Sequence, residues 1–276
     1  MIGDRLGVSE RAWQLLTEWS WEPSILIGTA LFVGAYLAAL VPFRSRFQDS
    51  EKTKQTQVLW FLLGTLLILL ALVSPLDAIG DGYLFTAHML QHALLMFAAP
   101  PLLWLGTPGW MLRPLLRDPI IERIARFFTM APVAFMLFNA NMAIWHLPLL
   151  YEATLENDTI HIIEHLSFIA TAILNWFPIQ SPLPELPRLP DSRRILYLVA
   201  SLIPSAMLGW FFVTATTVIY PTYAVAPRIF GIHGVDDQLI GGYMMAMPAS
   251  AVYLGAAALI LRQRYDRSER TRAEQP

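Results

Sequence analysis

The chain has 276 residues, of which 55% are hydrophobic and only 14% are charged. Soluble domains carry nearly twice that charged fraction, so the composition indicates an integral membrane protein. The formal net charge of −2 gives no reason to expect nucleic acid as a partner, and the lack of cysteine excludes disulfides, iron–sulfur clusters and thiolate zinc sites. Any bound metal must therefore be held by histidine, methionine, carboxylate or backbone groups.

The first segment, residues 1–22, is polar with apolar side chains at helical spacing, among them Leu15, Leu16 and Trp19. Trp13 and Trp21 add further aromatic rings. This pattern is typical of a short helix that lies in the membrane interface, with its tryptophans at the level of the headgroups. We expect it on the outer side of the membrane.

Seven apolar runs follow, and each is long enough to cross about 30 Å of hydrocarbon at about 1.5 Å per residue. The first run has no basic region before it and is too long for a signal peptide, so it is expected to stay as a transmembrane helix. The predicted fold is an all-α polytopic membrane protein with a seven-helix domain over residues 23–262. We place its helices near residues 24–42, 57–76, 83–105, 128–149, 158–179, 194–219 and 238–261.

Basic residues set the predicted orientation. All lysines and arginines except Arg5, Arg11 and Arg228 lie after the first, third, fifth or seventh predicted span. Cytoplasmic loops carry the excess of basic residues in membrane proteins, so these four segments are expected in the cytoplasm. The N-terminus is therefore predicted outside, and the basic tail, residues 263–276, is predicted in the cytoplasm.

The start of the third span carries two histidines, His88 and His92, four residues apart and hence on one helix face. Met96 is the next position on that face. Imidazoles that leave water without a partner cost free energy, so a helix in lipid carries them only when something compensates. Two imidazoles and a thioether suit a soft or borderline metal ion. The alternative is a pair of core histidines that hydrogen-bond to neighbouring helices.

The other histidines also fall on the predicted outer side. His146 lies at the outer end of the fourth span, His161 and His165 are four apart at the start of the fifth, and His233 precedes the seventh. We therefore predict that the outer ends of the third and fifth spans are neighbours, with the two pairs facing each other directly or across an ion. Glu164, between the second pair, is either a ligand or a partner that anchors a histidine ring.

The seventh span offers further candidates. Asp237, Gly241 and Met244 share one helix face by their spacing, and Gly241 with Gly242 would allow close approach of a neighbouring helix. Asp237 is either a ligand or, like Asp236, a cap of the seventh helix, and Met244 is either a ligand or core packing. The candidate metal ligands are His88, His92, Met96, His146, His161, His165, Asp237 and Met244.

Four sequence motifs carry a resemblance to a known family: HMLQHALLMFAAPPLLWLGTP, WHLPLLYEATL, the H-x-x-E-H segment with NWFPI, and DDQLIGGYMM. Together they resemble the CtaG-type, seven-span family of cytochrome c oxidase assembly proteins, over roughly Asp77 to Pro248. Ala246 departs from the pattern, because a tryptophan is typical of the family there. By motif, the resemblance implies functional roles for His88, His92, His146, His161, His165 and Asp237.

The resemblance also implies a location and partners. The protein is expected as a multi-pass protein of a bacterial inner (plasma) membrane, where it handles copper on the outer or periplasmic face during maturation of a haem–copper oxidase. An oxidase subunit and a copper chaperone are the candidate protein partners, in addition to the lipid bilayer.

Three functions remain open from the residues. The first is a non-enzymatic assembly protein that holds copper at a His/Met site, since imidazole and thioether ligands suit Cu(I) and allow release. The second is an intramembrane hydrolase with zinc held by three histidines and an aspartate. The third is a haem protein for electron transfer, with one axial histidine from the third span and one from the fifth. Metal analysis and an absorption spectrum would separate them.

Overall fold

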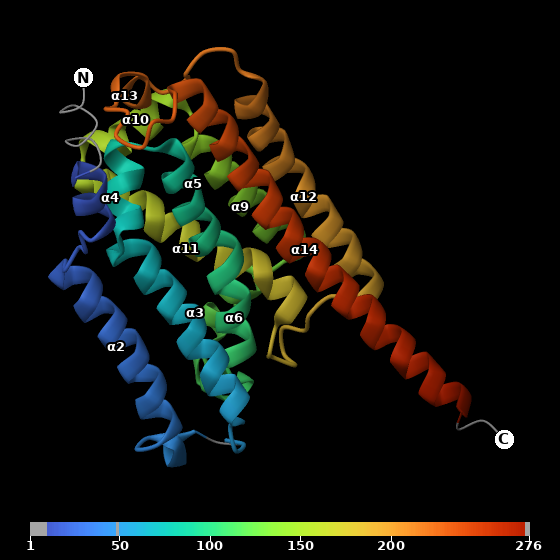
Figure 1. Ribbon diagram of the computed structural model, residues 1–276. Helices are drawn as coiled ribbons and strands as arrows, with labels where there is room; N and C mark the ends of the chain where they lie inside the picture. Colours follow the sequence, from blue (N-terminus) through green and yellow to red (C-terminus); the bar gives the residue numbers. More distant parts are fainter. Residues whose placement is uncertain (1–9, 48–49, 274–276) are drawn as a thin grey trace.

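The computed structural model describes residues 10–47 and 50–273 and shows a bundle of helices (Figure 1). Within these residues, six helical segments are long and apolar enough to cross a membrane, and a bent helix pair makes a seventh if it is one span. The predicted all-α, polytopic class is therefore confirmed. The six segments are α2 (Pro23–Leu40), α3 (Gln55–Val73), Phe85–Gly106, α11 (Asp158–Gln180), α12 (Asp191–Thr214) and α14 (Gly234–Ala273).

The bent pair corresponds to the fourth predicted span. Helices α8 (Pro119–Phe128) and α9 (Ala131–Trp145) meet at an angle of 65°. Asp118 caps α8 by accepting from the backbone N–H groups of Ile120 and Ile121. The 15 residues of α9 span only about 22 Å at about 1.5 Å per residue, so this crossing is short. The chain turns at His146 before α10 (Pro148–Glu156) begins.

The third span is an interrupted helix. It consists of α5 (Phe85–Ala93), the π-helical turn η2 (Leu94–Ala98) and α6 (Ala99–Gly106), and the Ala99 N–H bonds to the Leu94 carbonyl. Pro100 and Pro101 have no N–H group, so carbonyls one turn earlier lose their usual donors. The wider turn absorbs that mismatch and often marks a functional site.

Glycines allow α14 to pack closely against its neighbours. A Cβ atom on Gly242 would lie 2.6 Å from the carbonyl oxygen of Gly209 in α12, and one on Gly241 would lie 2.3 Å from Cδ1 of Phe85. These distances are too short for any other residue, so the predicted close approach at Gly241 and Gly242 is confirmed. Helix α14 thus runs directly against both α12 and α5 (Figure 1).

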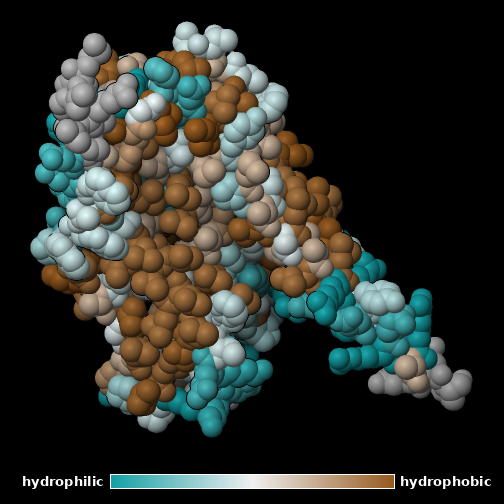
Figure 2. Space-filling model, in the orientation of Figure 1, coloured by the Kyte–Doolittle hydropathy of each residue, from teal (hydrophilic) through white to brown (hydrophobic). Residues whose placement is uncertain are grey.

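The two ends of the bundle differ in character. Short helices α4 (Pro75–Gly82), α10 and α13 (Pro221–Val225) gather at one end, and the C-terminal part of α14 projects from the other (Figure 1). Apolar residues cover the middle of the face that Figure 2 shows, whereas the projecting part of α14 is hydrophilic. This apolar belt between polar ends is what a bilayer requires. The sidedness of the two ends stays a prediction from the basic residues.

The N-terminal segment is described from residue 10 onward. Residues 10–16 are helical, and Leu15 packs against Ile79, Ala87 and Ile229 at the end of the bundle that carries α4. Trp13 and Trp21 are exposed. The rest of the predicted interfacial segment, residues 1–9, and the last three residues of the basic tail lie outside the described residues.

Candidate metal centre

The two histidine pairs face each other across α5 and α11. The ring centroids of His88 and His161 are 5.4 Å apart, and those of His92 and His165 are also 5.4 Å apart. Within each pair the rings are 4.3 Å and 4.1 Å apart. The prediction that the outer ends of the third and fifth spans are neighbours is therefore confirmed. Their proximity follows from one helical turn of spacing on each of two facing helices.

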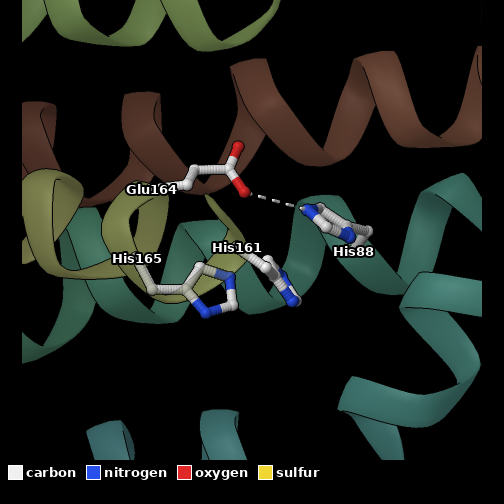
Figure 3. A group of neighbouring side chains, drawn as sticks. All are labelled: His88, His161, Glu164 and His165. Atoms are coloured by element: carbon white, nitrogen blue, oxygen red, sulfur yellow. Dashed lines mark ion pairs between the residues drawn. The ribbon is translucent and has the colours of Figure 1, made fainter. Parts of the chain in front are cut away.

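Four side chains form a compact cluster, which we call the histidine–glutamate cluster: His88, His161, Glu164 and His165 (Figure 3). Each offers one nitrogen or oxygen atom, and these atoms all lie within 4.8 Å of one another. Ligands around a tetrahedral ion with bonds of about 2.0 Å lie about 3.3 Å apart, so the set is slightly open and would close on an ion. Three imidazoles and a carboxylate suit zinc or copper.

The side chains of this cluster are buried, and three of the ring nitrogens lack a hydrogen bond. His88 and Glu164 have no exposed surface, and His165 is 6% exposed. Among the described residues, no hydrogen bond reaches Nε2 of His88, His161 or His165, and Nδ1 of His88 has the Asp81 carboxylate as its neighbour. Each buried polar atom without a partner costs about 1–3 kcal/mol. A bound cation would compensate these atoms together, so the residues fit a metal ion.

Asp81 of α4 lies at the mouth of the cluster. Its Oδ1 is 3.3 Å from Nδ1 of His88, its Oδ2 is 3.4 Å from Nδ1 of His161, and its side chain is 33% exposed. A carboxylate beside one ring nitrogen orients the imidazole and leaves the other nitrogen for a metal. Burial raises the pKa of Asp81 to about 6, against the lowering effect of His161, and Asp158 adds to the rise.

His92 and His146 adjoin the cluster without belonging to it. Nε2 of His92 is 3.8 Å from Oε2 of Glu164, and the rings of His92 and His146 are 5.9 Å apart. Nδ1 of His146 is 2.7 Å from the Met142 carbonyl oxygen. Because a carbonyl only accepts, Nδ1 carries the proton, and the buried Nε2 keeps its lone pair for another partner.

The seventh helix contributes differently from the prediction. The Asp237 carboxylate accepts from the backbone N–H groups of Phe85 (2.7 Å) and Thr86 (3.0 Å), so its contacts are those of a cap at the start of α5. Met244 packs against the aromatic group that contains Phe85 and Tyr151. The structure thus brings neither Asp237 nor Met244 into the histidine–glutamate cluster. His233 is exposed in the loop before α14.

A group of tyrosines covers the cluster, and the sequence reasoning missed it. Tyr151 of α10 stacks on Tyr220 at 3.8 Å, and its hydroxyl lies 3.1 Å from that of Tyr223. Tyr223 donates to the Gly80 carbonyl, and Tyr220 donates to the His146 carbonyl. All three rings are buried. These bonds link α4, α10 and α13, and the Tyr151 ring lies next to the cluster, 5.2 Å from the His88 ring.

The ligand set predicted from the sequence leaves out Asp81, and Glu164 is considered there only as an alternative ligand. The signals were present, because Glu164 lies three residues after His161 and Asp81 lies on a short helix directly before the third span. Met96 lies close to His92 as predicted, since both line one interior cavity.

A family model described as cytochrome c oxidase caa3 assembly factor matches residues 34–267. Comparison with curated proteins and comparison with solved structures gave no match. The matched range includes the histidine–glutamate cluster, Asp81, His92 and His146. It covers well over half of the chain and confirms the resemblance to the CtaG-type family. This protein therefore belongs to the cytochrome c oxidase caa3 assembly factor family.

Proposed function

We propose that this assembly factor binds a copper ion as cargo at the histidine–glutamate cluster and passes it to a subunit of a haem–copper oxidase. The observation that carries the proposal is the set of Nε2 atoms of His88, His161 and His165, which lack hydrogen bonds and lie beside the buried carboxylate of Glu164. The family description supports a role in oxidase assembly. Copper is the metal that such an oxidase must acquire and that imidazole nitrogen binds well.

The position of Asp81 suits uptake and release. Its carboxylate is one-third exposed and contacts both His88 and His161, so it connects the buried donors with the end of the bundle that carries α4. A negative charge at the entrance attracts a cation. We propose a binding role without catalysis, at the outer face of a bacterial plasma membrane, with a copper chaperone as donor.

The donor set also supports one alternative. Three nitrogens and one oxygen, without sulfur, are equally suited to zinc, and a carboxylate beside them could act on a zinc-bound water. This combination would make the protein an intramembrane hydrolase. Metal identity distinguishes the two functions, and a Soret band in the absorption spectrum would reveal haem instead.

The test is metal analysis of the full chain, purified in detergent from cells supplied with copper, together with the copper content of the oxidase in those cells. We expect the His88→Ala/His161→Ala variant to lose the copper held at this cluster, because two ligands are removed, and to leave the oxidase short of copper. His233→Ala is the matched control, since this histidine is exposed in the loop before α14.

Two results would overturn the proposal. In the first, the double variant retains as much copper as the parent protein, which would remove the cluster from metal binding. Alternatively, the parent protein would bind zinc and exclude copper, and the hydrolase would then be the better explanation.

A further inference from the structure

A small interior cavity lies next to the histidine–glutamate cluster. Its volume is about 10 Å³, which is room for one water-sized sphere. It is enclosed by side chains from α5, η2, α9, α12 and α14. Six of its lining residues carry nitrogen or sulfur donors: Met89, His92, Met96, Met142, His146 and Met245.

The sulfur content of this lining is unusual for the chain. Four of the 11 methionines line this one cavity, and none of the four is more than 5% exposed. Buried methionines commonly serve as core packing. Here, however, they surround a space of one ion's size together with two imidazoles, and a soft metal ion prefers that combination of donors.

The two imidazoles supply the second, independent observation. Nε2 of His146 is buried and unpartnered, because the proton of this ring is on Nδ1 and is donated to Met142. Nδ1 of His92 is also buried and unpartnered, while Nε2 of that ring is the atom near Glu164. Both residues are at least nine-tenths buried. Two nitrogens on residues that line the cavity therefore lack a hydrogen-bond partner among the described residues.

We propose that this methionine–histidine cavity is a second metal site, separate from the histidine–glutamate cluster, and that it takes one bare Cu(I) ion. The size of the cavity excludes a hydrated ion and any organic ligand. Its lining residues are neutral, and the cost of desolvating an ion rises with the square of its charge, so a monovalent ion is favoured over zinc. Thioether sulfur and imidazole nitrogen are suitable ligands for Cu(I).

The two sites share a wall. His92 lines the cavity, and its Nε2 is 3.8 Å from Glu164 of the cluster. An ion could therefore pass between the sites at a single histidine. A role for the cavity in holding copper during delivery to the oxidase rests on the proposed function. The binding of Cu(I) in the cavity is independent of that function.

In the test, the full chain in detergent is titrated with Cu(I) under anaerobic conditions and, separately, with Ag(I), a redox-stable ion of the same charge. A third titration, with Zn(II), measures binding at the histidine–glutamate cluster. X-ray absorption of the Cu(I)-loaded parent protein should show sulfur neighbours. Met142→Leu/Met245→Leu keeps the apolar volume and removes two sulfurs. We expect it to weaken Ag(I) and Cu(I) binding by more than about tenfold and to leave Zn(II) binding unchanged.

Met207→Leu/Met247→Leu is the matched control, because both methionines are exposed and lie on α12 and α14. It should bind Ag(I) as the parent protein does. The His88→Ala/His161→Ala variant should no longer bind Zn(II) but should still bind one Ag(I). An error in the proposed function of the cluster and an error in the proposed cavity site therefore give different results.

Copper with only nitrogen and oxygen neighbours in the parent protein would overturn the proposal, and this measurement needs no variant. Unchanged Ag(I) affinity in the Met142→Leu/Met245→Leu variant would overturn it too. In either case the cavity holds water between its two histidines.

Discussion

Two buried carboxylates, Asp237 and Glu164, show how single residues divide between scaffold and site. Neither has any exposed surface. Asp237 accepts two backbone hydrogen bonds at the start of α5, and this interaction explains its burial without a ligand. Glu164 lies instead beside the rings of His88, His92 and His165. The difference in partners marks Glu164, rather than Asp237, as the candidate ligand.

Asp77 offers a test of electrostatics at the end of the bundle that carries α4. Its Oδ1 accepts from Nε2 of Gln91 at 2.6 Å, and burial, followed by the charge of Asp81, raises the pKa of Asp77 to about 7. The folded protein therefore keeps the Asp77 carboxyl protonated to a higher pH than the unfolded chain, where the pKa of aspartate is about 3.9. The contribution of this group to the free energy of unfolding is fully present below about pH 4 and is lost as the pH rises to about 7.

We expect the Asp77→Asn variant to flatten that dependence, because the amide does not titrate. Between about pH 4 and 7, the free energy of unfolding of the parent protein should fall more steeply, by up to about 1.4 kcal/mol per pH unit. Thermal unfolding in detergent across this range measures the difference. Asp81 titrates in both the parent protein and the variant. Parallel plots of the free energy of unfolding against pH would therefore mean that Asp77 does not cause the pH dependence.

Helices α12 and α14 depend on glycine for their contact. A Cβ atom on Gly242 would lie 2.6 Å from the Gly209 carbonyl oxygen, so Gly242→Ala must push the two backbones apart. Overpacking of this kind costs about 1–3 kcal/mol in the free energy of unfolding. The same helix carries Asp237 and Met245, so the shift also reaches the cap of α5 and the methionine–histidine cavity.

Gly255→Ala is the matched control on the same helix, because a Cβ atom there meets nothing within 4 Å. It should be neutral or stabilising by up to about 1 kcal/mol, since alanine favours helix. Chemical unfolding in detergent compares the two variants. Equal stabilities would show that the α12–α14 contact tolerates a methyl group and is not set by glycine.

The orientation of the whole molecule in the membrane determines the side of the membrane on which the cluster can take up or release a metal ion. Helices α4, α10 and α13 and the tyrosines that cover the cluster lie at one end of the bundle, and the basic extension of α14 projects from the other (Figure 1). The positive-inside rule predicts that the basic end is cytoplasmic and that the cluster opens to the outside. The proposed delivery of copper at the outer face requires this arrangement.

Alkaline phosphatase fusions measure that orientation, because the enzyme is active only outside the cytoplasm. Fusions after residue 80 or 155 should be active, and fusions after residue 50 or 120 should be inactive. The reverse result would place the histidine–glutamate cluster at the cytoplasmic end and would contradict delivery of copper from the outer face.

The sequence by itself determined the spans and the faces of single helices, since a bilayer imposes a length and an apolar composition and an α-helix repeats every four residues or so. It also pointed to His88, His92, His161 and His165 as two facing pairs. Tertiary structure alone decided that Asp81 contacts two of these rings.

The packing of helices also decided which methionines meet. Sequence spacing favoured Met96 and Met244, yet the cavity joins Met96 with Met142 of α9 and Met245 of α14. Spacing along one helix says which residues share a face, but not which face a neighbouring helix meets. That choice depends on close glycine contacts, on the π-helical turn at Met96 and on the turn at His146, which are properties of the packed bundle.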